Sequence, residues 1–332
     1  MITSTIQSTM RHGLLVLLCA ANCVLSTVSY AAAPSYPTRP IRLIVASSPG
    51  GPNDLAARML ATPWGELLGR VIVIDNRAGA AGIIGTELVA RAAPDGYTLL
   101  VGFPGPLIIA PLLNASSPYD ASKDFAPISL AVAAPFVLVA HPGFPAKSVN
   151  ELIALARSRP GKINYASGGT GISSHLAMEL LNHVTKTKMV HVAYKGAGPG
   201  LTALLAGEVE VMFVALGAAL PHIKTEKVRA LALGGDKRSP LVPNVPTISE
   251  SGQRVNASSW YGMLAPHNTP RPVIKRLHDT LMQTLDASQT KTRLTDMAFE
   301  VIASTPDDFA KVIREETATW RQVITAAGLK GN

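Results

Sequence analysis

Apolar and polar positions beyond residue 40 form segments that predict strands and helices in alternation. The run IRLIVA at 41–46 is typical of a buried strand, residues 54–68 are typical of a helix, and RVIVIDN at 70–76 is typical of a second strand. A helix over 83–92 and a strand over 97–103 complete this set. Strands that alternate with helices predict a parallel sheet with helices on both faces.

A second set of strands and helices follows a proline-rich passage. Its pattern predicts strands at 134–142, 163–168, 189–194 and 209–215 and helices at 148–160, 174–183 and 200–206. Two further strands and three closing helices are expected at 227–235, 258–267, 272–286, 289–299 and 306–327. The last helix has Pro306 at its start and acids in its first turn, and Thr305 can cap it.

Two α/β lobes account for these two sets, since 332 residues exceed the roughly 150 residues of an average domain. Each lobe is expected to be a mainly parallel sheet flanked by helices. The chain is expected to cross between the lobes near residues 131–140 and 257–265, which gives two hinge strands. Lobe I would then comprise residues 32–134 and 257–332, and lobe II residues 135–256.

Residues 1–31 have the pattern of a cleaved secretory signal peptide. They contain one cation, Arg11, no acid, and an apolar stretch from 13 to 28 that is shorter than the roughly 20 residues of a membrane span. Small residues favour cleavage after Ala31, with Ala33 as the second choice. We therefore expect secretion with removal of this leader rather than a membrane anchor.

Both cysteines, Cys19 and Cys23, lie in that leader. The mature chain would have no thiol, which excludes cysteine catalysis, thiolate zinc sites and iron–sulfur clusters. Removal of Arg11 changes the formal charge from +8 to +7, a balance that favours anionic ligands. The longest basic cluster, at Lys237 and Arg238, is too short for nucleic-acid binding, so we expect none.

Glycine-rich loops follow four of the predicted strands. They read SSPGGPND from Ser47, GFPGPL from Gly102, SGGTGISSH from Ser167 and VALGAAL from Val214. Each loop joins the carboxyl end of a strand to the start of a helix, where unpaired backbone N–H groups and the positive end of the helix dipole suit an anion. Opposed loops on two lobes would form a cleft with further donors on Ser47, Ser48, Asn53, Ser167, Thr170, Ser173 and Ser174.

A small carboxylate fits such a cleft. Charge-assisted hydrogen bonds contribute roughly 1.5–3 kcal/mol each, and a micromolar site needs about 8 kcal/mol, so three or four net bonds suffice. Asp54 either caps the helix that follows the first loop or contacts the ligand. Tyr194 precedes another glycine segment, GAGPG, which either contacts ligand or is a turn.

Enzymatic interpretations find little support in these motifs. Asp75 ends the second strand where a ribose-binding acid would lie, but Gly50 and Gly51 are adjacent and do not form G-x-G-x-x-G. No phosphate-binding G-x-x-x-x-G-K-[ST] and no G-x-S-x-G elbow occur near Ser174 and His175. We expect neither catalysis, nor a cofactor, nor a metal.

Several ordered segments resemble the solute-binding proteins of tripartite tricarboxylate transporters, also called Bug-type receptors. They include YPTRPIRLIV, PGGPNDLAARML, NRAGAAGIIGTELVARAAPDGYTLL, GKINYASGGTGISSHLAMELL and VHVAYKGAGPGLTALLAGEVEVMF. The resemblance implies a two-lobed periplasmic-binding-protein (Venus flytrap) fold and capture of a small carboxylate for a membrane permease. It also implies that loop N–H groups, hydroxyls and waters hold the carboxylate.

The resemblance assigns ligand-binding roles to the first and third loops. Together with the donors above, the expected ligand-binding residues there are Ser48, Pro49, Gly50, Gly51, Asp54, Ser167, Gly168, Gly169, Thr170, Gly171, Ser174, His175 and Tyr194.

The second and fourth loops depart from the family pattern. Gly102 and Gly105 are kept, but Phe103 and Pro104 stand where relatives often have hydroxyl residues. Val214 and Ala215 stand where relatives often have a polar residue. We therefore expect one carboxylate at the glycine loops and an apolar ligand body against Phe103, Val214, Ala215 and Trp260.

The sequence thus predicts a monomeric periplasmic receptor that delivers a carboxylate to the permease subunits of a tripartite tricarboxylate-type transporter. Two alternatives stay open: a ligand sensor for a membrane histidine kinase, and a secreted α/β enzyme acting on a carboxylate.

Overall fold

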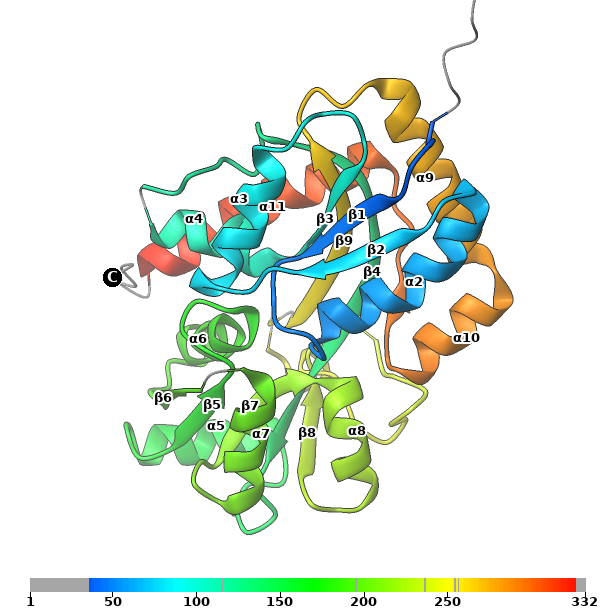
Figure 1. Ribbon diagram of the computed structural model, residues 1–332. Helices are drawn as coiled ribbons and strands as arrows, with labels where there is room; N and C mark the ends of the chain where they lie inside the picture. The colour runs from blue at the N-terminus through cyan, green and yellow to red at the C-terminus, as the bar shows by residue number, and fades with distance from the viewer. Residues whose placement is uncertain are drawn as a thin grey trace, which may run out of the picture. The chain divides into compact units, whose positions relative to one another are not determined.

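The computed structural model describes residues 36–114, 116–194, 196–235, 237–253, 255 and 257–326 (Figure 1). The predicted leader and both cysteines lie outside the described residues. From Arg39 onward the chain forms one compact unit, and the residues before it belong to a separate one.

The first sheet contains the early strands of the chain. Strand β1 (Ile41–Val45) pairs in parallel with β2 (Ile72–Asn76) on one side and with β3 (Thr98–Gly102) on the other. Strand β9 (Ser258–Pro266) lies antiparallel to β3, and β4 (Phe125–Ala140) lies antiparallel to β9. The two-residue strand β10 (Glu300–Val301) also pairs with β4.

The second sheet begins where the first one ends, on the later half of β4. That half pairs with β7 (Val211–Ala215) and β8 (Arg229–Leu233), both antiparallel to it. Strand β5 (Asn164–Ser167) then lies parallel to β7 and to β6 (Val190–Ala193). Because β4 belongs to both sheets, the chain has two α/β lobes with one continuous strand between them (Figure 1).

Helices surround each sheet. Those of the first lobe are α2 (Pro52–Leu68), α3 (Ile83–Ala90), α4 (Ala110–Leu113), α9 (Arg271–Asp286), α10 (Ser288–Asp296) and α11 (Pro306–Ala326). Those of the second lobe are α5 (Val149–Ser158), α6 (Ser173–Thr185), α7 (Ala197–Ala206) and α8 (Leu216–Lys224). Thr305 caps α11 as predicted, because its hydroxyl accepts the N–H of Asp308 at 3.1 Å.

Tryptophans occur only in the first lobe. Trp64 is fully buried on α2 and donates its indole N–H to Thr280 on α9 at 3.0 Å. Trp260 on β9 stacks edge-on against Phe309 of α11, with ring centroids 5.2 Å apart. The third, Trp320, packs against the same core cluster as Trp260.

The prediction of β4 was too short. The strand begins at Phe125 rather than near residue 134, and Pro127 and Pro135 lie inside it. Both prolines pair with β9, and the register shifts just after Pro127. A proline normally argues against a strand, because it cannot donate a hydrogen bond to the sheet. Strand β4 tolerates Pro127 beside a shift in its pairing with β9.

The chain returns to the first sheet at Ala257. The N–H of Ala257 donates to Gly234 at 2.7 Å, and its carbonyl accepts the N–H of Phe136 at 3.1 Å. The two crossings between the lobes are therefore hydrogen-bonded neighbours. Within the described residues no helix has the length and apolarity needed to cross a membrane.

Candidate functional site

The first glycine loop, between β1 and α2, is shaped by Asp54. This carboxylate is 2% exposed and accepts hydrogen bonds from the N–H of Gly50, from Arg58 Nε and from Asn76 Nδ2, each at 2.9 Å. Asn76 also donates to the carbonyl of Ser47 at 3.2 Å. Burial raises the pKa of Asp54, but these hydrogen bonds outweigh it and hold the pKa below its usual value. Asp54 therefore holds the loop as an anion.

The loop leaves donors available at the start of α2. Gly50 has φ 85°, a left-handed conformation that favours glycine, and Pro52 begins the helix. The first backbone N–H with a helical acceptor is that of Leu55, which donates to Gly51 at 2.9 Å. The N–H groups of Asn53 and Asp54 have no acceptor in the described part of the chain. Ser48, Pro49 and Gly50 are exposed, so this edge is open to solvent.

The third loop, between β5 and α6, uses several of its own N–H groups. The hydroxyl of buried Ser167 accepts the N–H of Gly169 at 3.1 Å, and His175 Nδ1 accepts the N–H of Gly171 at 3.1 Å. Ser174 Oγ lies 3.5 Å from the N–H of Gly168. These glycines shape the loop more than they present donors.

The free N–H donors next to the third loop belong to the first turn of α6. The N–H of Leu176 is the first in α6 with a helical acceptor, Ile172, at 3.1 Å. Those of Ser173, Ser174 and His175 have no acceptor within the described residues. Thr170 is exposed at the loop's tip.

A stacked pair of histidines lies beneath the third loop. The rings of His175 and His191 have centroids 3.9 Å apart, and Tyr165 stacks on His191 at 5.1 Å. His191 Nε2 lies 2.6 Å from Ser167 Oγ, and Tyr165 donates its hydroxyl to Glu179. Burial lowers the pKa of both histidines to about 4, so both are neutral near pH 7. Neutrality is what allows His175 Nδ1 to accept a hydrogen bond.

The second loop brings the two lobes together. A Cβ atom on Gly171 of the third loop would lie 2.9 Å from Leu113 Cδ1 on α4, just beyond the second loop. On the other side, a Cβ on Gly82 would lie 2.9 Å from the carbonyl of Ala46 and 3.0 Å from Pro106. The second loop therefore lies near Ala46, where the first loop begins, and the helix after it contacts the third loop.

Glycines of the second loop are required by its packing. Gly102 is buried at the end of β3, and a Cβ there would lie 2.3 Å from Leu264. A Cβ on Gly105 would lie 3.3 Å from the half-buried ring of Phe103, which packs on the core cluster of the first lobe.

The fourth loop packs into the core of the second lobe. Val214 is 1% exposed and Ala215 is 8% exposed, and their side chains belong to the core clusters of the second lobe. A Cβ on Gly217, in the first turn of α8, would lie 2.5 Å from the carbonyl of Met297. The chain after α10 therefore covers this loop.

Trp260 is also buried. It is 4% exposed and its indole N–H donates to Glu316 at 2.8 Å, so its ring is taken up by the core of the first lobe. Tyr194 is half-buried, and its hydroxyl lies 3.4 Å from Glu208 while its N–H donates to Ser167 at 3.0 Å. Of the four apolar residues predicted to contact the ligand body, Phe103 is the one that is not buried in a core cluster.

Several residues that shape the loops had no assigned role in the sequence. They are Arg58, Asn76, Tyr165, Glu179 and His191. Arg58 follows Asp54 by four residues, a spacing at which an ion pair forms on a helix. His191 lies opposite Tyr165 in the β5–β6 register, and no local motif marks that pairing.

The arrangement can bind an anion without a cationic side chain. Helices α2 and α6 each point free first-turn N–H groups outward from loops that buried side chains hold in place.

Comparisons with known proteins point to one family. The model of the tripartite tricarboxylate transporter family receptor matches residues 56–329. The chain is 36% identical to protein BugT of Bordetella pertussis over 300 residues, which are 90% of this chain and 92% of BugT.

Two solved structures from Rhodopseudomonas palustris are similar over their whole length. Rpa4515 with adipate is 32% identical with a TM-score of 0.83, and the match covers 90% of this chain and 100% of that one. MatC with bound malate is 34% identical with a TM-score of 0.79, and the match covers 87% and 100%.

Proposed function

Because the chain belongs to the tripartite tricarboxylate transporter receptor family, we propose that it is a periplasmic receptor that captures a small carboxylate and delivers it to the permease subunits of such a transporter. It has the two-lobed fold of periplasmic binding proteins. The proposal takes residues 32–134 and 257–332 as lobe I and 135–256 as lobe II, with β4 and the return at Ala257 as the hinge.

The observation that carries the proposal is the pair of helix N-termini behind the first and third loops. The free N–H groups at Asn53 and Asp54 of α2 and at Ser173, Ser174 and His175 of α6 are donors for carboxylate oxygens. Thr170 adds a hydroxyl. Related structures bound to adipate and to malate support a carboxylate as the ligand class.

The second loop favours an apolar ligand body. Phe103 and Pro104 offer a ring and an imino acid without an N–H, so a second charged group gains few partners there. The core positions of Val214, Ala215 and Trp260 restrict this apolar contact to the neighbourhood of Phe103. We expect aliphatic or aromatic monocarboxylates to bind more tightly than citrate or aspartate.

The remaining parts of the proposal follow from the same role. The receptor acts as a monomer, needs no cofactor and transforms no substrate. Its leader, residues 1–31, directs export and is removed.

Isothermal titration of hexanoate, benzoate, adipate, malate and citrate tests the proposal. Asp54→Asn removes the charge that orders the first loop, so the Kd of the tightest acid should rise at least about tenfold, equivalent to about 1.4 kcal/mol. Asp75→Asn is the matched control, because the partners of Asp75 on β2 within the described residues are Arg42 and Arg77 rather than a loop N–H. It should change the Kd by less than about twofold.

Two results would count against the proposal. Absence of binding by all five acids would remove the receptor role. Binding that Asp54→Asn leaves unchanged would remove the first loop from the site.

A further inference from the structure

The net positive charge of residues 32–332 comes almost entirely from one lobe. Residues 135–256 contain 13 lysines and arginines against 7 aspartates and glutamates, a balance of +6. Residues 32–134 and 257–332 together contain 16 against 15, a balance of +1. The ligand loops belong to both lobes, so the asymmetry serves something other than ligand charge.

Six of these thirteen cations lie at the end of the second lobe that is opposite its glycine loops. Strands β5, β6 and β7 are parallel and begin at this end, while α5, α6 and α8 end there. We call it the basic end, and it comprises Arg157, Arg159, Lys162, Lys186, Lys188 and Lys227. In Figure 1 it is the edge of the second lobe remote from the first.

The charges of the basic end are not neutralised by ion pairs. None of its six residues takes part in a side-chain ion pair within the described part of the chain. Arg157 donates to the carbonyl of Thr185, the last residue of α6, at 2.7 Å. It therefore stabilises the C-terminal end of that helix. Arg159, Lys162 and Lys188 lie beyond the helix ends and are exposed.

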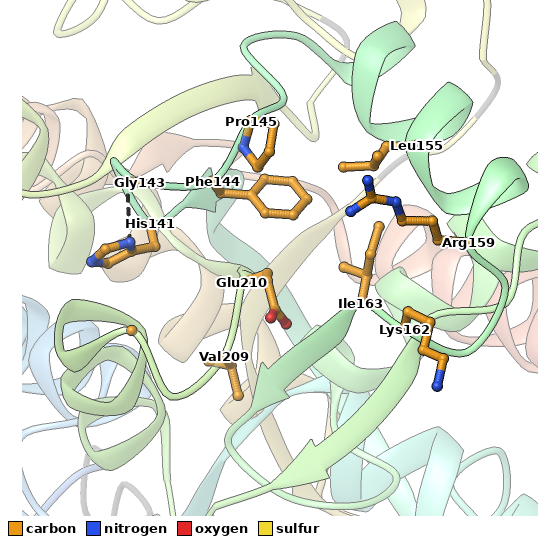
Figure 2. Close-up of a pocket in the computed structure, with 11 residues that line it drawn as sticks. His141, Gly143, Phe144, Pro145, Leu155, Arg159, Lys162, Ile163, Val209 and Glu210 are labelled. Carbon is orange, nitrogen blue, oxygen red and sulfur yellow. Dashed lines mark hydrogen bonds between the residues drawn. The ribbon is translucent and has the colours of Figure 1, made fainter.

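A pocket of about 330 Å³ opens within the basic end. Figure 2 shows the Phe144 ring directed into it, with Leu155, Ile163 and Arg159 on one side and His141 on the other. Glu210 forms part of its wall and accepts the N–H of Asn164 at 2.7 Å. The pocket lining is therefore mixed: it combines the apolar side chains of Phe144, Leu155 and Ile163 with the cations Arg159 and Lys162.

We propose that the basic end is the docking surface for an acidic extracytoplasmic segment of the membrane transport partner. The segment places one apolar side chain against Phe144 and Ile163 and its carboxylates beside Arg159 and Lys162. The proposal rests on the receptor role proposed above and adds the surface and chemistry of the partner.

Two features favour a protein partner over other occupants. A small free anion would meet the Glu210 carboxylate in the pocket wall, whereas a protein segment keeps its acids at the edge. An anionic lipid surface needs no cavity, but an apolar anchor side chain does. Charges around such an anchor mainly raise the association rate, so docking should weaken with added salt.

Charge reversal tests the surface in cells whose uptake depends on this receptor. The Arg159→Glu/Lys162→Glu variant should retain the parent Kd in calorimetry but support at least tenfold slower uptake of the tightest of the five acids, radiolabelled. Arg271→Glu/Arg293→Glu is the matched control. Both its positions are exposed on α9 and α10 and without an ion pair among the described residues, and uptake should stay within twofold. Leu155→Gln, at the half-buried pocket edge, should also slow uptake at unchanged Kd.

The outcomes separate this proposal from the receptor role. If deletion of the receptor leaves uptake unchanged, the receptor role fails. If the parent restores uptake and the Arg159→Glu/Lys162→Glu variant does so equally, the docking surface is wrong. Slower uptake accompanied by an equal loss of binding to phosphatidylglycerol vesicles, with Leu155→Gln unaffected, would assign the surface to lipid and overturn the proposal.

Discussion

At the scale of single residues, the third loop depends on a buried acceptor that must stay neutral. His175 is 3% exposed and holds Gly171 through Nδ1, while Ser167, Tyr165 and the carboxylate of Glu179 surround His191. Protonation of His175 would replace an acceptor with a donor facing the N–H of Gly171. Two protonated rings with centroids 3.9 Å apart would also repel each other.

This predicts that acid destabilises the protein. Burial lowers the pKa of His175 to about 4, below the value of about 6.5 in an unfolded chain, so the unfolded state binds more protons between these values. The free energy of unfolding is therefore highest above pH 6.5. It falls as the pH drops toward 4, by roughly 3 kcal/mol for one histidine. Urea unfolding at pH 7.5, 6, 5 and 4.5 measures it.

The histidine variants identify the source of that slope. His175→Asn keeps an acceptor that does not titrate, and it should remove about half of the loss between pH 6.5 and 4. His183→Asn changes an exposed histidine of the same helix and should leave the slope unchanged. Equal slopes for all three proteins would show that the buried pair does not control acid stability.

At the scale of elements, α8 is constrained at its first turn by the other lobe. Gly217 lies against the backbone of Met297, which follows α10. Alanine is normally better than glycine inside a helix by about 1 kcal/mol. Here the new methyl group would lie 2.5 Å from the Met297 carbonyl, and a backbone atom cannot rotate away as a side chain can.

Gly217→Ala is therefore expected to lower stability by about 1–3 kcal/mol, the usual cost of overpacking, and to weaken ligand binding by holding the lobes apart. Gly198→Ala in α7 is the control, because a Cβ there meets nothing within 4 Å. It should raise stability by up to about 1 kcal/mol. Urea midpoints and calorimetry measure both effects, and equal gains for the two variants would refute the constraint.

The elements also show what sequence patterns can and cannot predict. Helix α2 begins at Pro52 and α11 is capped by Thr305, because proline, hydroxyl and acidic residues act on their immediate neighbours. The first half of β4 was missed because its support comes from β9, more than a hundred residues away, and prolines mask its pattern.

The features of the candidate site also separate into those that local sequence predicts and those that depend on distant contacts. The glycine loops were predicted, since strand–glycine–helix order is local. The role of His191 follows only from its register opposite Tyr165, and the burial of Val214 and Trp260 follows from how whole lobes pack.

At the scale of the whole molecule, β4 joins the two lobes energetically. Its residues contribute to three core clusters among the described residues, with Phe125 and Leu130 in a cluster of the first lobe and Phe136 to Ala140 in two clusters of the second. Unfolding one lobe would strip one end of β4 of its partners. The lobes should therefore unfold together.

The tryptophans make this testable. All three, Trp64, Trp260 and Trp320, belong to the first lobe, so their fluorescence reports that lobe, whereas far-ultraviolet circular dichroism averages over both. We expect the two signals to give the same urea midpoint. Ligand at about 100 times Kd should raise the free energy of unfolding measured by each signal by about 2.7 kcal/mol. Separate midpoints would mean that β4 does not couple the lobes.

The pairing of Phe136 with Ala257 bears on how such receptors diversify. The chain enters the second lobe at Phe136 and leaves it at Ala257, and the N–H of Phe136 donates to the carbonyl of Ala257 at 3.1 Å. The second lobe is therefore an insertion whose two ends are adjacent. A single recombination event between relatives could exchange this segment as a cassette. It would replace the third loop, its histidine pair and the basic end at once while the first and second loops stayed in place, so new combinations of ligand and partner would arise without rebuilding either sheet.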